Sequence, residues 1–307
     1  MAKPIVILGI FNADTAYRAT RLPRLGETIM GLGFHLGPGG KGSNQAVAAA
    51  RAGGDVHMIT RLGADDFAMM ARGIWAEAGV TPHVIEDVES HTGSAFIFLE
   101  EGTGQNAIIV CPGAAGGLSK ADVQANSALI AGAGVFLTQL EQPMEAALAG
   151  LQIARAAGVT TMLNPAPAAA LSDALLALVD IITPNESEAE GLTGLPVTTL
   201  AEAEAAADAL IARGVGAVIV TLGEKGVLYR KGGHSLHVPA RAPGPVRETT
   251  GAGDAFNGGF AAALAEGQPI EAALRFGCAV AGISVTRAGA AAAMPKRAEV
   301  DSFLANP

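Results

Sequence analysis

The chain has 307 residues, of which 50% are hydrophobic but only 4% aromatic, and its net charge is −9 at pH 7. A globule of this length buries about 75% of the surface of its unfolded chain, so it needs no disulfide or metal to stabilise its core. An acidic chain lacks the basic surface that general nucleic-acid binding requires. The two cysteines, Cys111 and Cys278, form no CxxC pair and indicate no zinc site.

The chain contains no apolar stretch of the roughly 18 residues that a membrane span needs. The apolar run at residues 5–10 is too short for a signal peptide and is followed by polar residues. We therefore expect a soluble, cytoplasmic protein with neither membrane nor nucleic-acid partners.

Short β-branched runs alternate with helical patterns along most of the chain. Strands are predicted at residues 5–10, 56–60, 135–140, 159–163, 180–183 and 217–221, and helices at residues 43–52, 65–78, 144–157 and 200–213. Such alternation predicts βαβ units around a buried, mostly parallel sheet flanked by helices.

Two regions break this alternation, at residues 14–37 and 91–111. They contain strand-like stretches at residues 27–35, 92–99 and 106–111 with no helix between them. We expect these two insertions to form a small, discontinuous β-sheet as part of a single α/β domain that spans residues 1–307.

Polar side chains follow two of the predicted strands. Asn12 and Asp14 come after the first strand, and Glu141 follows the strand at residues 135–140. Open α/β sheets bind ligands beyond the carboxyl ends of their strands, so these side chains are candidates for binding hydroxyl groups. Polar residues at strand ends are also often simply solvated.

Residues 37–45 read GPGGKGSNQ and precede a predicted helix. The segment formally contains GxGxxG, but it does not follow the first strand directly and lacks an acidic residue about 20 positions later, so a dinucleotide site is disfavoured. It is not a P-loop either, because Gly42 follows Lys41. Lys41 and Asn44 on a floor of small residues suit a polyol; a plain helix start packed through small residues is the alternative.

Two further segments lie near a predicted strand end or helix start. Asn185 and Glu188 are three residues apart in TPNESE at residues 183–188, so they share one side of a helix start and can lie beside Mg²⁺ and phosphate. An ordinary N-cap with an acidic first turn explains the same pattern. Residues 221–226 (TLGEKG) form a turn that suits either a nucleotide or a simple hairpin.

The sequence TTGAGDAF at residues 249–256 carries the strongest chemical signal. Its small residues let a backbone approach a ligand, and the helical run at residues 257–265 places a positive dipole end beside it. Phosphoryl transfer needs preorganised donors of this kind. Asp254 lies in the first turn, where it can accept a hydroxyl proton; an N-cap aspartate is the simpler interpretation.

Together and in this order, these segments resemble the ribokinase family of carbohydrate kinases over essentially the whole chain. The similarity is strongest at residues 39–48 (GGKGSNQAVA), 163–168 (LNPAPA), 180–186 (DIITPNE) and 251–254 (GAGD). The resemblance implies a ribokinase-like α/β fold with a small β lid, ATP and Mg²⁺ as cofactors, and transfer of the γ-phosphoryl group to the primary hydroxyl of D-ribose. It also implies a homodimer formed through the lid.

The resemblance further implies a role for each matched residue. The sugar contacts would be Asn12, Asp14, Gly40, Lys41, Asn44 and Glu141, and the nucleotide contacts Asn185, Thr221, Gly223, Gly226 and, near the adenine, Cys278. Glu188 would lie near the Mg²⁺–phosphate network. Gly251, Ala252 and Gly253 would form the anion hole, with Asp254 as the base.

The chain departs from the family pattern at the family's monovalent-cation site. Glu248 stands where Asp is usual, and Ala293 where Ser is frequent. Backbone carbonyls of Thr250, Ser284, Arg287 and Gly289 remain available as ligands, so we expect a K⁺ site of altered strength. Cys278 replaces the usual Asn or His, and Gly113-Ala114-Ala115 lacks the usual Asn.

Three alternatives to a ribose kinase stay open. One is a kinase for another pentose, a ketohexose, a deoxy-sugar acid or a nucleoside. Another is a sugar-binding regulator without activity, which the intact Asp254 and its glycines disfavour. A dehydrogenase is the third, and only the formal GxGxxG supports it.

Overall fold

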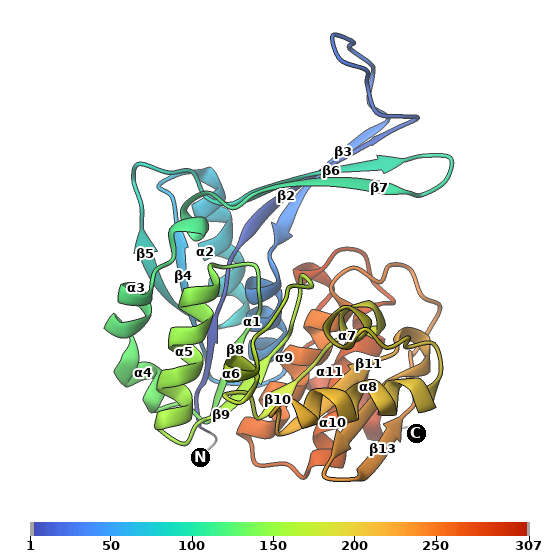
Figure 1. Ribbon diagram of the computed structural model, residues 1–307. Coiled ribbons are helices and arrows are strands. Elements are labelled where there is room, and N and C mark those ends of the chain that lie inside the picture. Colours follow the sequence, from blue (N-terminus) through green and yellow to red (C-terminus); the bar gives the residue numbers. More distant parts are fainter. Residues whose placement is uncertain (1–2, 306–307) are drawn as a thin grey trace.

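The structure, a computed structural model, describes residues 3–305 and contains two separate β-sheets (Figure 1). The large sheet has the strand order β13-β12-β11-β10-β9-β8-β1-β4-β5, and it is parallel except for β12 and β13. Its strands are β1 (Ile5–Leu8), β4 (Val56–Leu62), β5 (Thr81–Glu86), β8 (Val135–Thr138), β9 (Thr160–Leu163), β10 (Ile181–Ile182), β11 (Ala217–Thr221), β12 (Val227–Lys231) and β13 (His234–Val238). This confirms the predicted, mostly parallel sheet.

Helices cover both faces of the large sheet (Figure 1). One face carries α1 (Lys41–Arg51), α2 (Asp66–Ala78), α9 (Ala252–Ala265), α10 (Ile270–Ser284) and α11 (Arg297–Ala305). The other carries α3 (Lys120–Ala125), α4 (Ser127–Ala131), α5 (Met144–Ala156), α6 (Asp173–Leu176), α7 (Glu186–Thr193) and α8 (Leu200–Ala212). Short 3-10 turns lie at η1 (Gly113–Gly117), η2 (Gly223–Lys225) and η3 (Ala291–Ala293).

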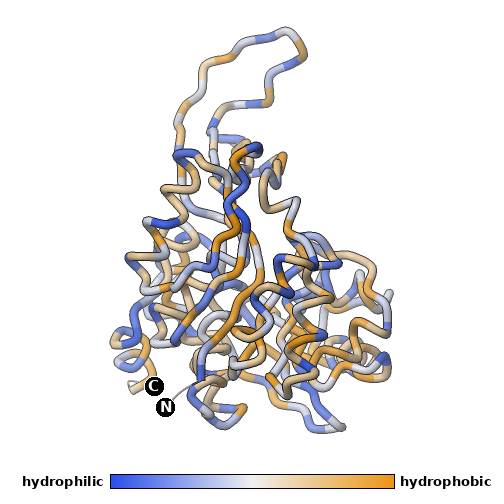
Figure 2. The backbone as a smooth tube through the Cα atoms, turned by 90° about the vertical axis from the view of Figure 1, so that its left-hand side faces the viewer, coloured by the Kyte–Doolittle hydropathy of each residue, from blue (hydrophilic) through white to orange (hydrophobic). Residues whose placement is uncertain are grey.

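Burial on both faces explains the continuous apolar run of β1. Ile5 and Ile7 point into the core formed with α1, α2, α9 and α10, whereas Val6 and Leu8 point into the core formed with α5 and α8. Alternate side chains of a strand face opposite sides of its sheet, so every position of β1 must be apolar. Figure 2 shows apolar residues concentrated along these central strands.

The second sheet has the order β3-β2-β6-β7 and is built from two sequence-distant insertions, as predicted. Its strands are β2 (Asn12–Ala19), β3 (Gly33–Gly39), β6 (Ser94–Glu100) and β7 (Asn106–Cys111). β2 pairs antiparallel with β3 and parallel with β6, and β6 pairs antiparallel with β7. In Figure 1 it projects from the main body as an extended arm.

The strand predicted at residues 27–35 is wrong. The structure has β3 at Gly33–Gly39 instead, and β2 at Asn12–Ala19 was not predicted. Most of residues 20–32 form an exposed loop that stands clear of the body in Figure 2, with Leu25 and Met30 almost fully exposed. An apolar pattern forms a strand only where a partner strand is in reach, and this loop has none within the described chain.

Other boundaries differ by a few residues. β1 ends at Leu8 and β8 at Thr138, two residues before the predicted ends, and β10 has only two residues, Ile181–Ile182. The helix after the glycine motif begins at Ala252 rather than at residue 257, so Asp254 belongs to its first turn. Glycine disfavours helix interiors, and this hid the true start.

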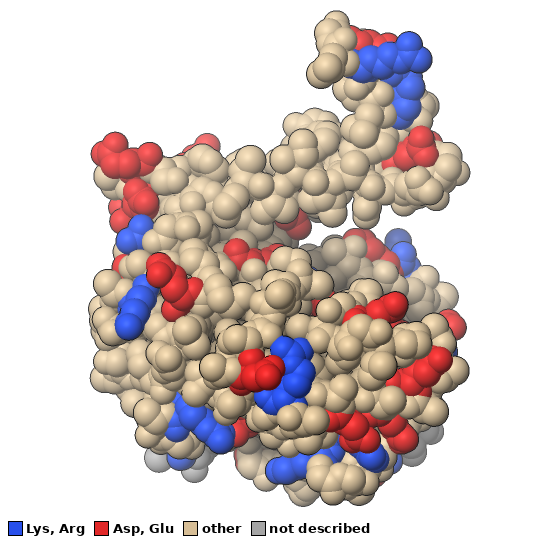
Figure 3. Space-filling model, viewed as in Figure 1, with Lys and Arg blue, Asp and Glu red and all other residues tan. Residues whose placement is uncertain are grey.

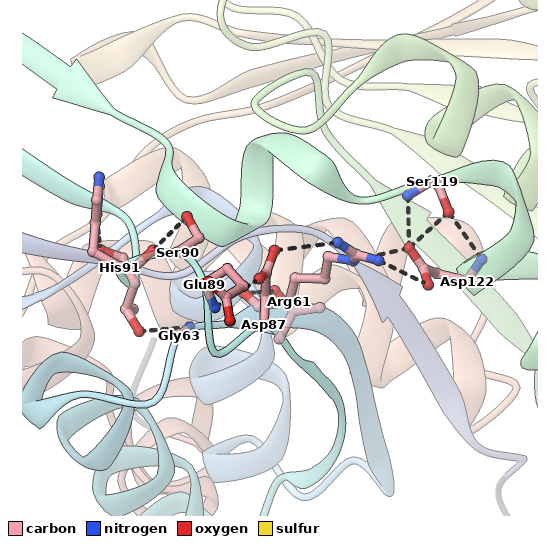
Figure 4. Close-up of polar contacts among 10 residues, drawn as sticks. Arg61, Gly63, Asp87, Glu89, Ser90, His91, Ser119 and Asp122 are labelled. Atoms are coloured by element: carbon pink, nitrogen blue, oxygen red, sulfur yellow. Dashed lines mark hydrogen bonds and ion pairs between the residues drawn. The ribbon is translucent and has the colours of Figure 1, made fainter.

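An ion-pair network lies where the chain enters and leaves the insertion that contributes β6 and β7 to the small sheet (Figure 4). Arg61, at the end of β4, binds Asp122 (Nε–Oδ2 3.0 Å) and Asp87 (Nη1–Oδ2 3.5 Å). Asp122 also accepts hydrogen bonds from the N–H and Oγ of Ser119, both at 2.8 Å. The network joins the loop before β6 to the N-terminus of α3.

No helix within residues 3–305 has the length and apolar character of a membrane span.

Candidate active site

A cavity of about 720 Å³ opens beside the N-terminus of α9 and the carboxyl ends of β9, β10 and β11. Every candidate nucleotide-binding residue and the whole glycine motif line it: Asn185, Glu188, Thr221, Gly223, Gly226, Cys278, Gly251, Ala252, Gly253 and Asp254. Lys41 lines it too, although its position suggested a sugar contact. None of the lining residues belongs to the small sheet; Figure 3 shows a separate hollow between that sheet and the body, with acidic side chains along its rim.

The N-terminus of α9 faces this cavity without a side-chain cap. Its N-cap is Gly251, with φ of 75°, and no hydrogen bond from a described side chain caps the helix. The first N–H groups of a helix have no partner inside the helix, and its dipole makes this end positive. The turn formed by Gly251, Ala252 and Gly253 therefore suits the binding of an anionic group.

Asp254 lies buried at this turn, between two amide side chains of α1. Its Oδ2 accepts a hydrogen bond from Asn44 Nδ2 at 3.0 Å, and its Oδ1 accepts one from Gln45 Nε2 at 2.9 Å. Burial raises the pKa of Asp254, and the Lys41 ammonium and the two amides oppose that rise. A carboxylate with a raised pKa is a stronger base, so Asp254 suits the acceptance of a hydroxyl proton.

The remaining polar candidates for the sugar site gather around Asp254 and Lys41. Burial, and then the charge of Asp254, raise the pKa of Asp14 to about 6. Burial also raises the pKa of Glu141 to about 7, although its Oε2 accepts the Lys41 N–H at 2.7 Å. Burial disfavours the Lys41 ammonium, but Asp254, Glu141 and Glu188 outweigh this and raise its pKa. Carboxylates thus surround one cation.

Four buried amide oxygens, those of Gln139 and Gln142 included, have no hydrogen-bond partner among the described residues, and two of the four belong to candidate sugar contacts. These two are Oδ1 of Asn12, which begins β2, and Oδ1 of Asn44 on α1. Buried polar atoms are almost always paired, so an unpaired acceptor indicates a missing donor. The hydroxyl groups of a sugar are donors of this kind.

Gly40 allows the start of α1 to approach the start of β2 closely. It has φ of 85°, and a Cβ there would lie 2.6 Å from the carbonyl oxygen of Ile10 and 2.9 Å from the nitrogen of Asn12. Only glycine combines this backbone angle with that clearance. The start of α1, with Lys41 and Asn44, thereby packs against the start of β2.

Asn185 and Glu188 form the capping box of α7. Asn185 Oδ1 accepts the Glu188 N–H at 2.8 Å, and Glu188 Oε2 accepts the Asn185 N–H at 2.9 Å. The ordinary capping role is therefore present, and the same two residues also line the cavity. Burial raises the pKa of Glu188. Within residues 3–305 no group of three or more acidic, His or Cys side chains could hold a metal ion.

The candidate monovalent-cation residues surround the loop that follows α10. Glu248 Oε2 accepts the Gly289 N–H at 2.9 Å, and the carbonyl of Ser284 accepts the Arg287 N–H at 3.0 Å. Thr250, which is exposed, precedes Gly251 at the N-terminus of α9. This loop touches the glycine motif, since a Cβ on Gly251 would lie 2.9 Å from the Ala290 Cβ.

Several side chains that the structure places at the site had no role predicted from the sequence. Gln45 contacts Asp254, Asn257 binds the carbonyl of Gly253, and Asn164 and Thr183 line the cavity. A weak signal existed, because Gln45 and Asn164 lie inside the segments that resemble the family. Their contacts span up to about 200 residues of sequence, and spacing along the chain does not reveal them.

Comparison with known proteins agrees with this geometry. Residues 2–297 match the pfkB family carbohydrate kinases. The chain is 41% identical over 305 residues to the ribokinase of Haemophilus influenzae, covering 99% of each, and 34% identical over 302 residues to the deoxyribokinase of Salmonella typhi, covering 98% of each. It superposes on the structure of Arabidopsis thaliana ribokinase complexed with ribose and ATP with a TM-score of 0.95, at 32% identity and 99% coverage of each chain. This chain therefore belongs to the pfkB family and is an ATP-dependent carbohydrate kinase.

Proposed function

We propose that the acceptor sugar of this kinase is D-ribose and that its product is ribose 5-phosphate. The unpaired Oδ1 atoms of Asn12 and Asn44 carry the proposal, because they lack the donors that sugar hydroxyls supply. Asn44 hydrogen-bonds Asp254, and Asn12 begins the strand that carries Asp14. The similarity to ribokinases over the full chain supports ribose in particular.

In this proposal each group of the site has a separate task. Asn12, Asp14, Gly40, Lys41, Asn44 and Glu141 hold the sugar so that its primary hydroxyl faces Asp254, which accepts the proton. Bound ATP, with Mg²⁺ near Glu188, supplies the phosphoryl group. The backbone N–H groups of Gly251 and Gly253 stabilise the negative charge that develops on the transferred group. The N–H of Ala252, between them, donates to the Thr249 carbonyl at 3.1 Å. Asn185, Thr221, Gly223, Gly226 and Cys278 line the nucleotide site.

A coupled assay of ADP release across a panel of acceptors tests the substrate directly. The panel should contain ribose, 2-deoxyribose, fructose, a deoxy-sugar acid and adenosine. We expect the highest kcat/KM with ribose. A higher value with 2-deoxyribose, which the similarity to deoxyribokinase makes the main rival, would refute ribose but retain the kinase.

Replacing Asp14 with alanine should weaken ribose binding and leave ATP binding nearly unchanged. The lost carboxylate leaves sugar hydroxyls without a partner, which costs about 1–3 kcal/mol, or roughly 5- to 150-fold in Kd. Titration calorimetry with each ligand measures both affinities. Asp66→Ala, at an exposed position on α2, is the control. Unchanged ribose affinity in Asp14→Ala would place Asp14 outside the sugar site.

The small sheet serves in this proposal as a lid over the sugar and as the contact between two subunits. Its exposed side chains include the aromatic residues Tyr17 and Phe34 and the apolar run Ile108 to Val110, each 44–63% exposed. Replacing Ile109 with aspartate should convert a dimer into a monomer, since a buried, unpaired charge destabilises an interface. Light scattering after size exclusion measures the change. A wild-type monomer at micromolar concentration would contradict the dimer.

The altered cation site should make activation by K⁺ weak. Glu248 is a methylene longer than Asp and already accepts the Gly289 N–H, and Ala293 offers no hydroxyl oxygen. We expect Glu248→Asp with Ala293→Ser to lower the KCl concentration that gives half-maximal turnover. Ionic strength is held constant with a bulky organic cation. Steep activation of the wild type at low millimolar KCl, or an unchanged response in the double variant, would contradict this expectation.

A further inference from the structure

Gln45 makes the most constrained side-chain contacts to the proposed base. It lies on α1 and is fully buried. Its Nε2 donates to Asp254 Oδ1 at 2.9 Å and to Asn164 Oδ1 at 3.1 Å, and its Oε1 accepts from Gln139 Nε2 at 2.6 Å. The Thr183 carbonyl accepts from Asn164 Nδ2, so Asn164 presents its Oδ1 to Gln45, and this identifies the end of the Gln45 amide that faces it as the NH₂ group. The NH₂ group must therefore point at Asp254.

The same amide row continues to the anion-binding turn. Asn164 Nδ2 donates to the carbonyl of Thr183 at 3.1 Å, and Thr183 Oγ1 donates to Asn257 Oδ1 at 2.7 Å. Asn257 Nδ2 in turn donates to the carbonyl of Gly253 at 2.9 Å. These side chains are all buried. A connected row of buried hydrogen bonds restricts motion, because breaking one leaves polar atoms unpaired.

The packing of α1 on α9 holds Gln45 in this place. A Cβ on Gly258 would lie 2.6 Å from the carbonyl oxygen of Gln45 and 2.6 Å from the Ala48 Cβ. The two helices can approach this closely only because Gly258 has no side chain. Gln45 consequently has little freedom to turn away from Asp254.

Gln45 and its neighbour Asn44 differ in what they leave free. Asn44 donates to Asp254 but keeps an unpaired Oδ1, which suits a sugar hydroxyl. The amide of Gln45 is occupied at both ends by protein groups. Contacts to the sugar therefore fall to Asn44, whereas Gln45 contacts only protein groups, Asp254 among them.

We propose that Gln45 is a positioning residue for phosphoryl transfer: it fixes the orientation of the Asp254 carboxylate and favours its ionised form. This inference rests on the proposed role of Asp254 as base. A hydrogen bond to the charged form of an acid favours that form. Losing it leaves a base that is turned away from the acceptor hydroxyl and protonated at higher pH, while both substrates still bind.

Two substitutions test this role. Gln45→Met keeps the length of the side chain and removes its hydrogen bonds, and Gln45→Leu removes them with a shorter side chain that is also uncharged. We expect kcat to fall about 10- to 100-fold in both, a typical share of a general-base contribution, with KM for ribose and ATP within about threefold. The acidic limb of the kcat profile should move to higher pH by about half a unit or more, since Asp254 loses a donor.

Other charged groups also face Asp254, namely Lys41, Asp14, Glu141 and Glu188. The acidic limb of the kcat profile therefore reports on these ionisable groups titrating together. Of this group, Asp254 is the member that Gln45 contacts, so a shift caused by Gln45 variants reports on Asp254. Ser43→Ala is the control: it removes a buried hydrogen bond from the same helix, the one that Trp75 Nε1 donates at 2.9 Å, away from Asp254.

The outcomes separate this inference from the proposed function. Ser43→Ala should lower the thermal midpoint but leave the pH limb in place. If the acidic limb of the kcat profile stays within about 0.2 pH unit of wild type in both Gln45 variants while Asp254→Asn is inactive, the positioning role is overturned. An equal shift in Ser43→Ala would overturn it too. Full turnover of Asp254→Asn would instead remove the proposed base. If Gln45→Met does not fold, Gln45→Leu decides.

Discussion

Replacing Asp254 with asparagine should abolish nearly all turnover and leave ribose affinity within a few-fold of wild type. The change keeps the shape of the side chain but removes the group that accepts the hydroxyl proton. General bases contribute about 10²- to 10⁴-fold, so kcat should fall by that factor. Steady-state ADP release measures kcat, and calorimetry measures ribose binding. Turnover within tenfold of wild type would show that another group takes the proton.

The fold should survive this substitution. The new NH₂ group would meet the Nδ2 of Asn44 or the Nε2 of Gln45, but Asn44 can rotate its amide and offer its Oδ1, which is now unpaired. The buried carboxylate has a raised pKa, so its ionisation lowers the stability of the ligand-free protein as pH rises through that pKa. Removing the charge should leave the thermal midpoint at pH 7.5 unchanged or higher. A much lower midpoint would mean that lost turnover reflects unfolding.

The local chemistry of the site could be read from the sequence because it depends on short segments. Small residues before a helix, as at Gly251–Asp254, require close backbone approach wherever they occur. The alternation of strands and helices fixed the parallel sheet for the same reason, since a buried strand such as β1 must be apolar at every position. The nucleotide candidates therefore met in one cavity.

The errors arose where structure depends on distant partners. Whether Asn12–Ala19 or residues 27–35 form a strand is decided by pairing with β6, which lies about 80 residues further on. The contacts of Gln45 to Gln139, Asn164 and Asp254 are equally non-local. Lys41, a predicted sugar contact, also lines the cavity that holds the nucleotide candidates, and its spacing from them along the chain did not reveal this.

The Lys41 ammonium stabilises the charged forms of the carboxylates that surround it in the site. Its charge lowers the pKa values of Asp254, Glu141 and Glu188 against the effect of burial. These three carboxylates in turn keep the ammonium charged. Removing one partner of a buried charged group leaves the others uncompensated, which is more harmful than the loss of a surface ion pair.

Replacing Lys41 with methionine should therefore lower kcat/KM about 100-fold or more and move the acidic limb of activity to higher pH. The lost ammonium also removes positive charge from the transition state, an effect of about 10²–10³ for single donors in comparable sites. The exposed Lys231→Met is the control and should leave both quantities unchanged. An unshifted limb in Lys41→Met would show that Lys41 does not set the ionisation of the carboxylates.

The stability of the ligand-free Lys41→Met variant should depend on pH in a direction that these pKa shifts fix. Glu141 has a folded pKa of about 7, above its ordinary value of 4.5, so its contribution to stability is full below 4.5 and is lost as pH rises through 7. Without Lys41 the folded pKa rises further, and the loss is larger. Urea unfolding should therefore show similar midpoints for variant and wild type at pH 5 and a lower midpoint for the variant at pH 8. An equal difference at both pH values would mean that Lys41 stabilises the fold by packing and not by its charge.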